Sequence, residues 1–183
     1  NDNHDMSRIY TQMKEDISKT KMAVGLMLIL PRIPQILYGT EILMQDTAQP
    51  GDHGLIRSDF PGGWKNDETN AFTGENMKND QIEMQNYLKT VLNFRKNSKA
   101  IHYGKTLHYA PINGIYLISR KNDDETVLYI INKNNFDKEL NLERFAELKI
   151  DNAILRDIYS GEKFIWKDKI TLKKNSSIIL TNK

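Results

Sequence analysis

Cysteine is absent from this 183-residue chain, so disulfides, thiolate metal sites and cysteine nucleophiles are all excluded. An excess of charge of one sign is also missing, because 26 Lys and Arg residues against 24 Asp and Glu residues leave a formal net charge of only +2. A balance this even argues against a nucleic-acid partner. The longest uninterrupted apolar run, MAVGLMLIL at residues 22–30, is far shorter than the roughly 20 residues that span a bilayer, which argues against membrane insertion.

What is present is an ordinary globular composition, with 39% hydrophobic and 27% charged residues. Residues 17–30 are predicted to form a helix whose second half is apolar on every side, which indicates burial all round. Pro31 ends this helix, and the run IPQILYG at residues 33–39 is predicted to be a buried strand. A buried helix followed by a buried strand favours an α/β layered or barrel architecture.

The middle of the chain is predicted to be a long loop followed by a second helix. Residues 45–80 are polar and contain five glycines, and loops of this length inside compact domains are usually functional. Residues 80–100 then place apolar side chains at helical spacing, with Asp80 as the candidate N-cap.

From about residue 102 short β-prone runs alternate with turn signals, which predicts an all-β sandwich. The predicted strands cover residues 105–110, 114–120, 126–132, 153–159, 162–166, 169–172 and 176–182. The segment NLERFAEL at residues 141–148 is predicted to be a helical turn, and the aromatic residues Tyr109, Tyr116, Tyr129 and Trp166 are predicted to lie mostly in the core. We therefore expect two parts, an incomplete α/β piece at 1–101 and a β domain at 102–183. Either the first piece docks on the β domain, or its missing strands precede residue 1.

Asn3, His4 and Asp5 stand together at the start of the chain and are the residues best suited to chemistry. An imidazole beside a carboxylate can serve acid–base work, metal ligation or sugar binding, although the same dipeptide is common in solvated loops. Metal ligation is disfavoured because the other histidines have no ligand-like spacing to His4. Taken alone, the triplet therefore favours a solvated loop.

The surrounding sequence changes that interpretation, because the order of motifs resembles the alpha-amylase family of glycoside hydrolases. Asn3, His4, Asp5 and Arg8 match that family's last signature segment. Residues 31–41, PRIPQILYGTE, resemble its eighth barrel strand, with Arg32 in place of the usual glycine and Leu37 in place of the usual aromatic residue. Residues 94–96, Phe-Arg-Lys, resemble the end of its last barrel helix, and SSIILTN at 176–182 resembles its C-terminal β domain.

The resemblance implies the C-terminal part of a (β/α)₈ TIM barrel followed by an all-β Greek-key sandwich. It implies that Asp5 is the transition-state stabiliser, that His4 hydrogen-bonds the sugar, and that Asn3 and Arg8 are structural residues near the site. The nucleophile and the acid/base would then lie upstream of the chain, so the fragment alone is expected to be inactive. Tyr38 and Glu41 are expected to be structural residues at the barrel rim.

The loop PGDHGLIRSDFPGGW, residues 50–64, resembles the cyclomaltodextrinase and neopullulanase branch, which implies that Asp52 and Arg57 bind substrate. Phe60 and Trp64 either stack on glucose faces or form a compact loop that packs its own aromatic rings. Asp59 has the Arg-x-Asp spacing of a family nucleophile, but its position after the eighth strand argues against that role.

The leading hypothesis is the C-terminal part of a retaining α-glucan hydrolase acting on maltooligosaccharides, cyclodextrins, pullulan or starch. A non-catalytic alpha-amylase-like sugar-binding or partner subunit is the alternative, and a stand-alone sugar-binding β-sandwich is disfavoured by the apolar helix, which needs neighbours. The expected partner is an α-glucan oligosaccharide, and a homodimer would cover apolar surface meant for the barrel. No cofactor is visible, while calcium in an upstream part of the enzyme and a periplasmic or secreted location are suggested by the resemblance alone.

Overall fold

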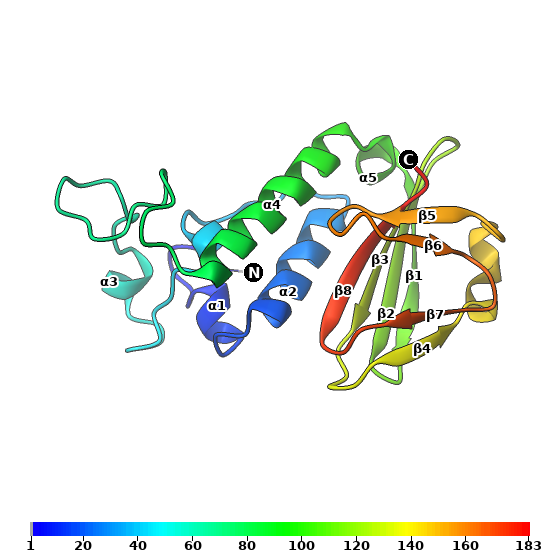
Figure 1. The fold of residues 1–183 in the computed structure, drawn as a ribbon, viewed down its shortest axis with the longest axis horizontal. Helices are drawn as coiled ribbons and strands as arrows, with labels where there is room; N and C mark the ends of the chain where they lie inside the picture. The colour runs from blue at the N-terminus through cyan, green and yellow to red at the C-terminus, as the bar shows by residue number, and fades with distance from the viewer. Residues whose placement is uncertain (1) are drawn as a thin grey trace. The chain divides into compact units, whose positions relative to one another are not determined.

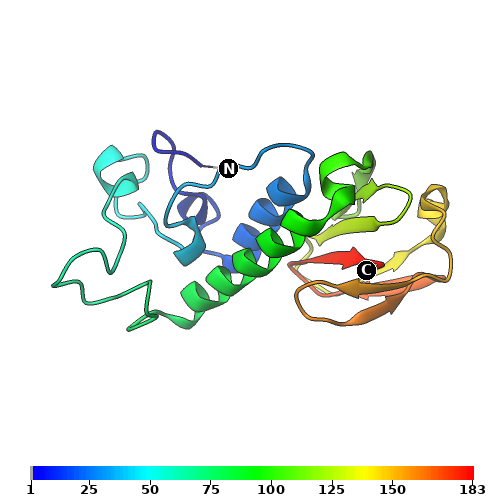
Figure 2. The ribbon, with the colours of Figure 1, turned by 90° about the horizontal axis from the view of Figure 1, so that it is seen from above.

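The structure, a computed structural model, describes residues 2–183 and contains two compact units (Figures 1 and 2). The first unit comprises the residues up to Val24 together with Pro34–Lys89, and the second comprises Gly25–Ile33 together with Thr90–Lys183. Two helices contribute to both units, α2 at Ile17–Ile29 and α4 at Asn79–Asn97. In the described part of the chain, no helix is both long and apolar enough to cross a membrane.

The first unit is built from short helices and loops around the two long helices. Its short elements are α1 at Ile9–Gln12, η1 at Thr40–Ile42 and α3 at His53–Ile56. Within this unit Lys21 of α2 forms an ion pair with Glu83 of α4, and the hydroxyl of Tyr87 donates to the carbonyl of Lys21 at 3.3 Å. These contacts hold the first half of α2 against the first half of α4.

The buried strand predicted for residues 33–39 is wrong in this structure. The segment has no regular secondary structure and pairs with no strand, Ile33 is 97% exposed, and Gly39 adopts a left-handed turn before η1. A strand is stable only when its backbone groups pair with a neighbour, and every strand pair within residues 2–183 is antiparallel and lies beyond residue 104, apart from an isolated bridge between Asn70 and Glu75. The apolar run therefore has the composition of a buried strand but no sheet to join.

The two predicted helices are confirmed as α2 and α4, and a third, α5, follows at Lys99–Tyr103. Helix α4 begins at Asn79, which places Asp80 in its first turn rather than at its N-cap. The buried guanidinium of Arg95 donates to the carbonyls of Leu28, Leu30 and Arg32 in the second unit. Arg95 thus pairs with one carbonyl in the last turn of α2 and with two carbonyls just beyond it, and so fixes the chain where this helix ends.

The β domain in the second unit has a six-stranded antiparallel sheet in the order β1-β2-β3-β8-β5-β6 and a two-stranded sheet formed by β4 and β7 (Figure 1). The strands are β1 Lys105–Ile112, β2 Ile115–Lys121, β3 Thr126–Asn132, β4 Lys138–Asn141, β5 Ile154–Asp157, β6 Lys163–Ile165, β7 Lys169–Leu172 and β8 Ser176–Thr181. The helical turn η2 lies at Glu143–Leu148, as predicted. Seven of these strands were predicted, and only β4 was not.

The core of this domain lies between the two sheets. Leu117, Leu128 and Leu180 from the large sheet are buried together with Leu140 and Ile170 from the small one. Tyr129 and Trp166 are also buried, as the sequence predicted, whereas Tyr109 and Tyr116 are only half-buried.

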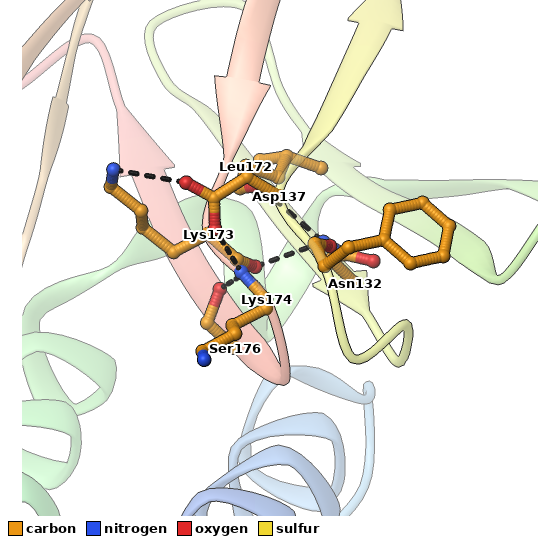
Figure 3. Close-up of polar contacts among 7 residues, drawn as sticks. Asn132, Asp137, Leu172, Lys173, Lys174 and Ser176 are labelled. Carbon is orange, nitrogen blue, oxygen red and sulfur yellow. Dashed lines mark hydrogen bonds and ion pairs between the residues drawn. The ribbon is translucent and has the colours of Figure 1, made fainter.

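A buried amide joins two loops at one end of this domain (Figure 3). Asn132 is fully buried, and its Nδ2 donates to the carbonyls of Phe136 at 3.1 Å and Lys173 at 2.9 Å. Asp137 accepts from the backbone N–H of Lys174 at 2.8 Å and from Nζ of Lys173 at 3.1 Å, and these bonds lower the pKa of its carboxyl. The connections β3–β4 and β7–β8 are therefore fixed to each other.

Charged side chains from the β2–β3 hairpin hold both ends of α5. Glu125 is buried, and its Oε2 accepts from the backbone N–H of Ala100 at 2.9 Å in the first turn. Arg120 is also buried, and its Nη2 donates to the carbonyl of Ile101 at 2.8 Å. A carboxylate at the N-terminal end and a cation at the C-terminal end complement the partial charges of a helix.

Candidate functional site

The structure brings three of the predicted site residues together in the first unit. Arg57 Nη2 lies 2.6 Å from Oδ1 of Asp5, and His4 Nε2 lies 3.1 Å from Oδ2 of the same carboxylate. Arg57 Nε donates to the carbonyl of His4 at 2.9 Å. We call these three residues the His4–Asp5–Arg57 cluster. Its side chains remain accessible, with exposed fractions of 69%, 56% and 47% respectively.

The local fold explains how residues so far apart in the sequence meet. The side-chain oxygen of Asn3 accepts from the backbone N–H of Asp5 at 2.8 Å, and Met6 N–H donates to the carbonyl of Asn3 at 3.1 Å, so the triplet forms a tight turn. Arg57 follows directly after α3 as its C-cap. A turn and a short helix therefore present the two charges to each other.

Asp52 lies at the opposite end of α3 from Arg57. Its Oδ1 accepts from the backbone N–H of Leu55 at 2.9 Å, so one carboxylate oxygen caps this helix. The cluster instead gains His53, whose Nδ1 lies 3.2 Å from Arg57 Nη2. Sequence reasoning missed His53 because it weighed histidines only by their spacing to His4.

Arg8, three residues after Asp5, is fully buried. Its guanidinium donates to the carbonyls of Tyr38 and Ile56 and lies 4.9 Å from the centre of the Tyr38 ring. Arg8 therefore connects the N-terminal turn to the segment before η1 and to α3. Gly39 allows this approach, because a Cβ at this position would lie 3.1 Å from Arg8 Nη1 and 2.1 Å from Met44 Sδ.

A buried carboxylate, Asp46, hydrogen-bonds residues that follow the N-terminal turn and holds them in place. The sequence did not predict this residue. It accepts from the hydroxyl of Ser7 at 2.7 Å, from the N–H of Gly51 at 2.7 Å and from the N–H of Arg8 at 3.1 Å. Burial by itself raises the pKa of Asp46, but these hydrogen bonds outweigh that effect and hold the pKa below its ordinary value. Asp46 is a single aspartate in a polar loop, so no sequence pattern distinguishes it.

The other predicted rim residues lie in the same unit. The hydroxyl of Tyr38 donates to the carbonyl of Ser58 at 2.9 Å, and its side chain is partly exposed. Glu41 is half-buried in the first turn of η1. Asp2 accepts from the backbone N–H of Ile9 at 2.8 Å and so orders the start of α1.

The aromatic residues of the following loop differ in their packing. The rings of Phe60 and Phe72 pack with centroids 5.2 Å apart. Trp64 is 66% exposed, and its Nε1 donates to Oδ2 of Asp59 at 2.9 Å. The indole face is therefore accessible and held in place, while Asp59 serves as its hydrogen-bond partner.

The arrangement suits recognition of a polar, uncharged ligand. Asp5 is held by a guanidinium on one oxygen and an imidazole on the other, so its carboxylate is oriented and can still accept further hydrogen bonds. Within residues 2–183 no group of three or more His, Cys, Asp or Glu side chains could hold a metal ion. Oriented hydrogen bonding to hydroxyl groups is the chemistry that this cluster offers.

Comparison with known proteins gives the family context. Residues 106–181 match the family model of the cyclo-malto-dextrinase C-terminal domain. A cyclomaltodextrin glucanotransferase from Thermoanaerobacterium thermosulfurigenes is 29% identical over 133 residues, which cover 73% of this chain and 16% of that protein. The chain thus spans about one sixth of the length of this curated relative.

Solved structures of the same kind superpose on nearly the whole chain. The alpha-amylase from Geobacillus thermoleovorans, complexed with acarbose, has a TM-score of 0.73 at 21% identity and covers 98% of this chain and 37% of its own. AmyP in complex with maltose has a TM-score of 0.78 at 15% identity and covers 100% of this chain and 40% of its own. These likenesses show the fold, including the antiparallel β domain. With the matches in sequence they agree with the resemblance drawn from the motifs, and the chain is similar to the C-terminal part of alpha-amylase-family enzymes.

Proposed function

We propose that this chain forms the C-terminal part of a retaining α-glucan hydrolase that cleaves α-1,4-glucosidic bonds. The observation that carries the proposal is the His4–Asp5–Arg57 cluster, because two segments more than fifty positions apart converge on one carboxylate. The similar proteins named above include an alpha-amylase and a cyclomaltodextrin glucanotransferase, which agrees with this class of substrate.

In this proposal Asp5 binds sugar hydroxyls and favours the oxocarbenium-like transition state, while His4 hydrogen-bonds the same sugar. Arg57 orients Asp5 and contributes to substrate binding. Asp52 is a further candidate substrate ligand through its second carboxylate oxygen. Asn3, Arg8, Tyr38 and Glu41 support the backbone around the cluster. The nucleophile and the acid/base would come from residues preceding this chain.

The proposal also gives residues 1–101 a place at the end of a (β/α)₈ barrel and residues 102–183 the role of the C-terminal sandwich domain. The segment before η1 pairs with no strand and supports this placement, because Ile33 is almost completely exposed and Tyr38 is 42% exposed. Pairing with further strands would stabilise such an apolar segment, because it would remove apolar side chains from water.

The test uses the complete polypeptide that contains this chain, assayed for sugar release from maltotriose, a cyclodextrin and pullulan. We expect hydrolysis of at least one substrate with the product released as the α-anomer, followed by NMR. We expect Arg57→Ala to raise KM and lower kcat/KM, since it frees both Asp5 and the turn at His4. Binding of these sugars without any turnover would favour the alternative, a non-catalytic sugar-binding subunit, and release of the β-anomer would contradict retention.

A further inference from the structure

A second cleft lies within the β domain, away from the cluster described above. It has a volume of about 600 Å³ and is formed where α5, β1 and β2 meet η2. Its lining includes Tyr103, Lys105, Leu107, Ser119, Lys121 and Glu147. All of them belong to the second unit, and the volume is that of ordinary small-molecule sites.

The fold builds this cleft through a close backbone approach. Gly104 joins α5 to β1, and a Cβ at this position would lie 2.4 Å from the carbonyl oxygen of Ala100 and 2.7 Å from that of Lys121. On the other side, Nζ of Lys121 donates to the carbonyl of Leu148 at 2.6 Å and holds the end of η2 in place. One wall is therefore fixed by a close approach of the main chain and the other by a side-chain hydrogen bond to the main chain.

Two features of the lining are unusual for a surface that faces only water. The ring of Tyr103 is 85% exposed. Ser119, which pairs with Leu107 across β1 and β2, is 1% exposed, and its hydroxyl has no hydrogen-bond partner among the described residues. A buried hydroxyl without a partner destabilises the folded chain, because it has lost its hydrogen bonds to water and gained none in return. A ligand hydroxyl could pair with it once the partly exposed side chain of Leu107 turns aside.

The charges of the lining indicate which ligand fits. Lys105 and Lys121 are balanced by Asp123 and Glu147, so the cleft carries no net charge and favours neither an anion nor a cation. An exposed aromatic ring beside several hydrogen-bond donors and acceptors suits a neutral, polyhydroxylated molecule. We propose that this cleft is a second, non-catalytic binding site for an α-glucan oligosaccharide, with the ring of Tyr103 against a sugar face. The choice of an α-glucan rests on the function proposed above.

The test is a titration of the isotope-labelled complete polypeptide that contains this chain with maltoheptaose, followed by amide NMR. We expect saturable shifts at Lys105, Ser119 and Glu147. Tyr103→Ala should weaken the affinity at these amides about tenfold, the size expected for one aromatic contact. Tyr159→Ala is the matched control, since this partly exposed tyrosine lies between β5 and β6 and does not line the cleft. Glu147→Ala tests the opposite wall if Tyr103→Ala fails to fold.

The outcomes separate this proposal from the function it rests on. Shifts confined to residues around Asp5, or equal affinities for Tyr103→Ala and Tyr159→Ala, overturn the second site and leave the proposed function intact. Saturable shifts at the cleft support the second site even if the complete polypeptide shows no hydrolysis. An absence of shifts in both units overturns the second site, and the hydrolysis assay then decides the proposed function independently.

Discussion

Replacing Glu125 with alanine should destabilise the β domain by about 2 kcal/mol. Glu125 is 3% exposed, and its Oε2 accepts from the backbone N–H of Ala100 at 2.9 Å. A hydrogen bond to a charged group contributes about 1.5–3 kcal/mol, and losing a side-chain partner at a helix N-terminus costs about 0.5–2 kcal/mol. The two figures describe the same contact, so they are alternatives and do not add. For a chain of this size, about 2 kcal/mol corresponds to a fall of roughly 4–8 °C in Tm.

The assay is urea unfolding with linear extrapolation, together with thermal unfolding followed by circular dichroism. Glu125→Gln should lose less than Glu125→Ala, because the amide oxygen can still accept from Ala100. Asp123→Ala is the matched control, since this exposed carboxylate lies on the same hairpin and should change stability by less than about 0.5 kcal/mol. The reasoning is refuted if Glu125→Ala unfolds like the wild type, or if Asp123→Ala costs as much.

Two further predictions concern the first unit. Because the pKa of Asp46 is lowered in the folded state, its stabilising effect should be complete above its unfolded pKa of about 4 and should be lost as the pH falls through the lower folded value. Asp46→Asn should therefore flatten the acid limb of the stability–pH curve, and an unchanged limb in urea titrations would contradict this. Gly39→Ala should lower Tm because of the positive φ of 85° and the clash with Met44. Adding Met44→Ala should restore part of that loss, and a loss that is unchanged in the double variant would show that the clash is not the cause.

The β domain was largely predictable because its strands carry their own signals. Residues 126–132 are mostly β-branched or aromatic, and they form the central strand β3, which is buried along almost its whole length. Strand β4, KELN, was missed because only Leu140 is buried and its polar neighbours resemble a loop. Its strand character comes from pairing with β7, which only the tertiary structure supplies.

For the segment before η1 the error was the opposite one, because a strand was predicted where none forms. Its composition predicts a buried strand, but the strand state depends on partners that residues 2–183 do not provide. Local sequence gives a preference for a state, while pairing decides whether that state forms.

Sequence motifs indicated His4, Asp5 and Arg57, but they did not indicate residues whose roles come only from packing. The family resemblance assigned His4, Asp5 and Arg57 to a sugar site, and the structure places these three side chains in contact, while their roles in binding and catalysis stay predictions. The roles of Asp46 and His53 depend on how the polar loop folds back, and neither residue has a neighbour in sequence that indicates it.

The most direct test of the central claim is the effect of Asp5→Asn on kcat/KM for maltotriose in the complete polypeptide. We expect a loss of roughly a thousandfold or more, because the variant removes interactions that strengthen in the transition state. Asp59→Asn is the matched control, since Asp59 accepts from Trp64 in the same loop region and should keep its rate within about a factor of ten. A wild-type rate for Asp5→Asn in an enzyme that hydrolyses maltotriose would contradict the account.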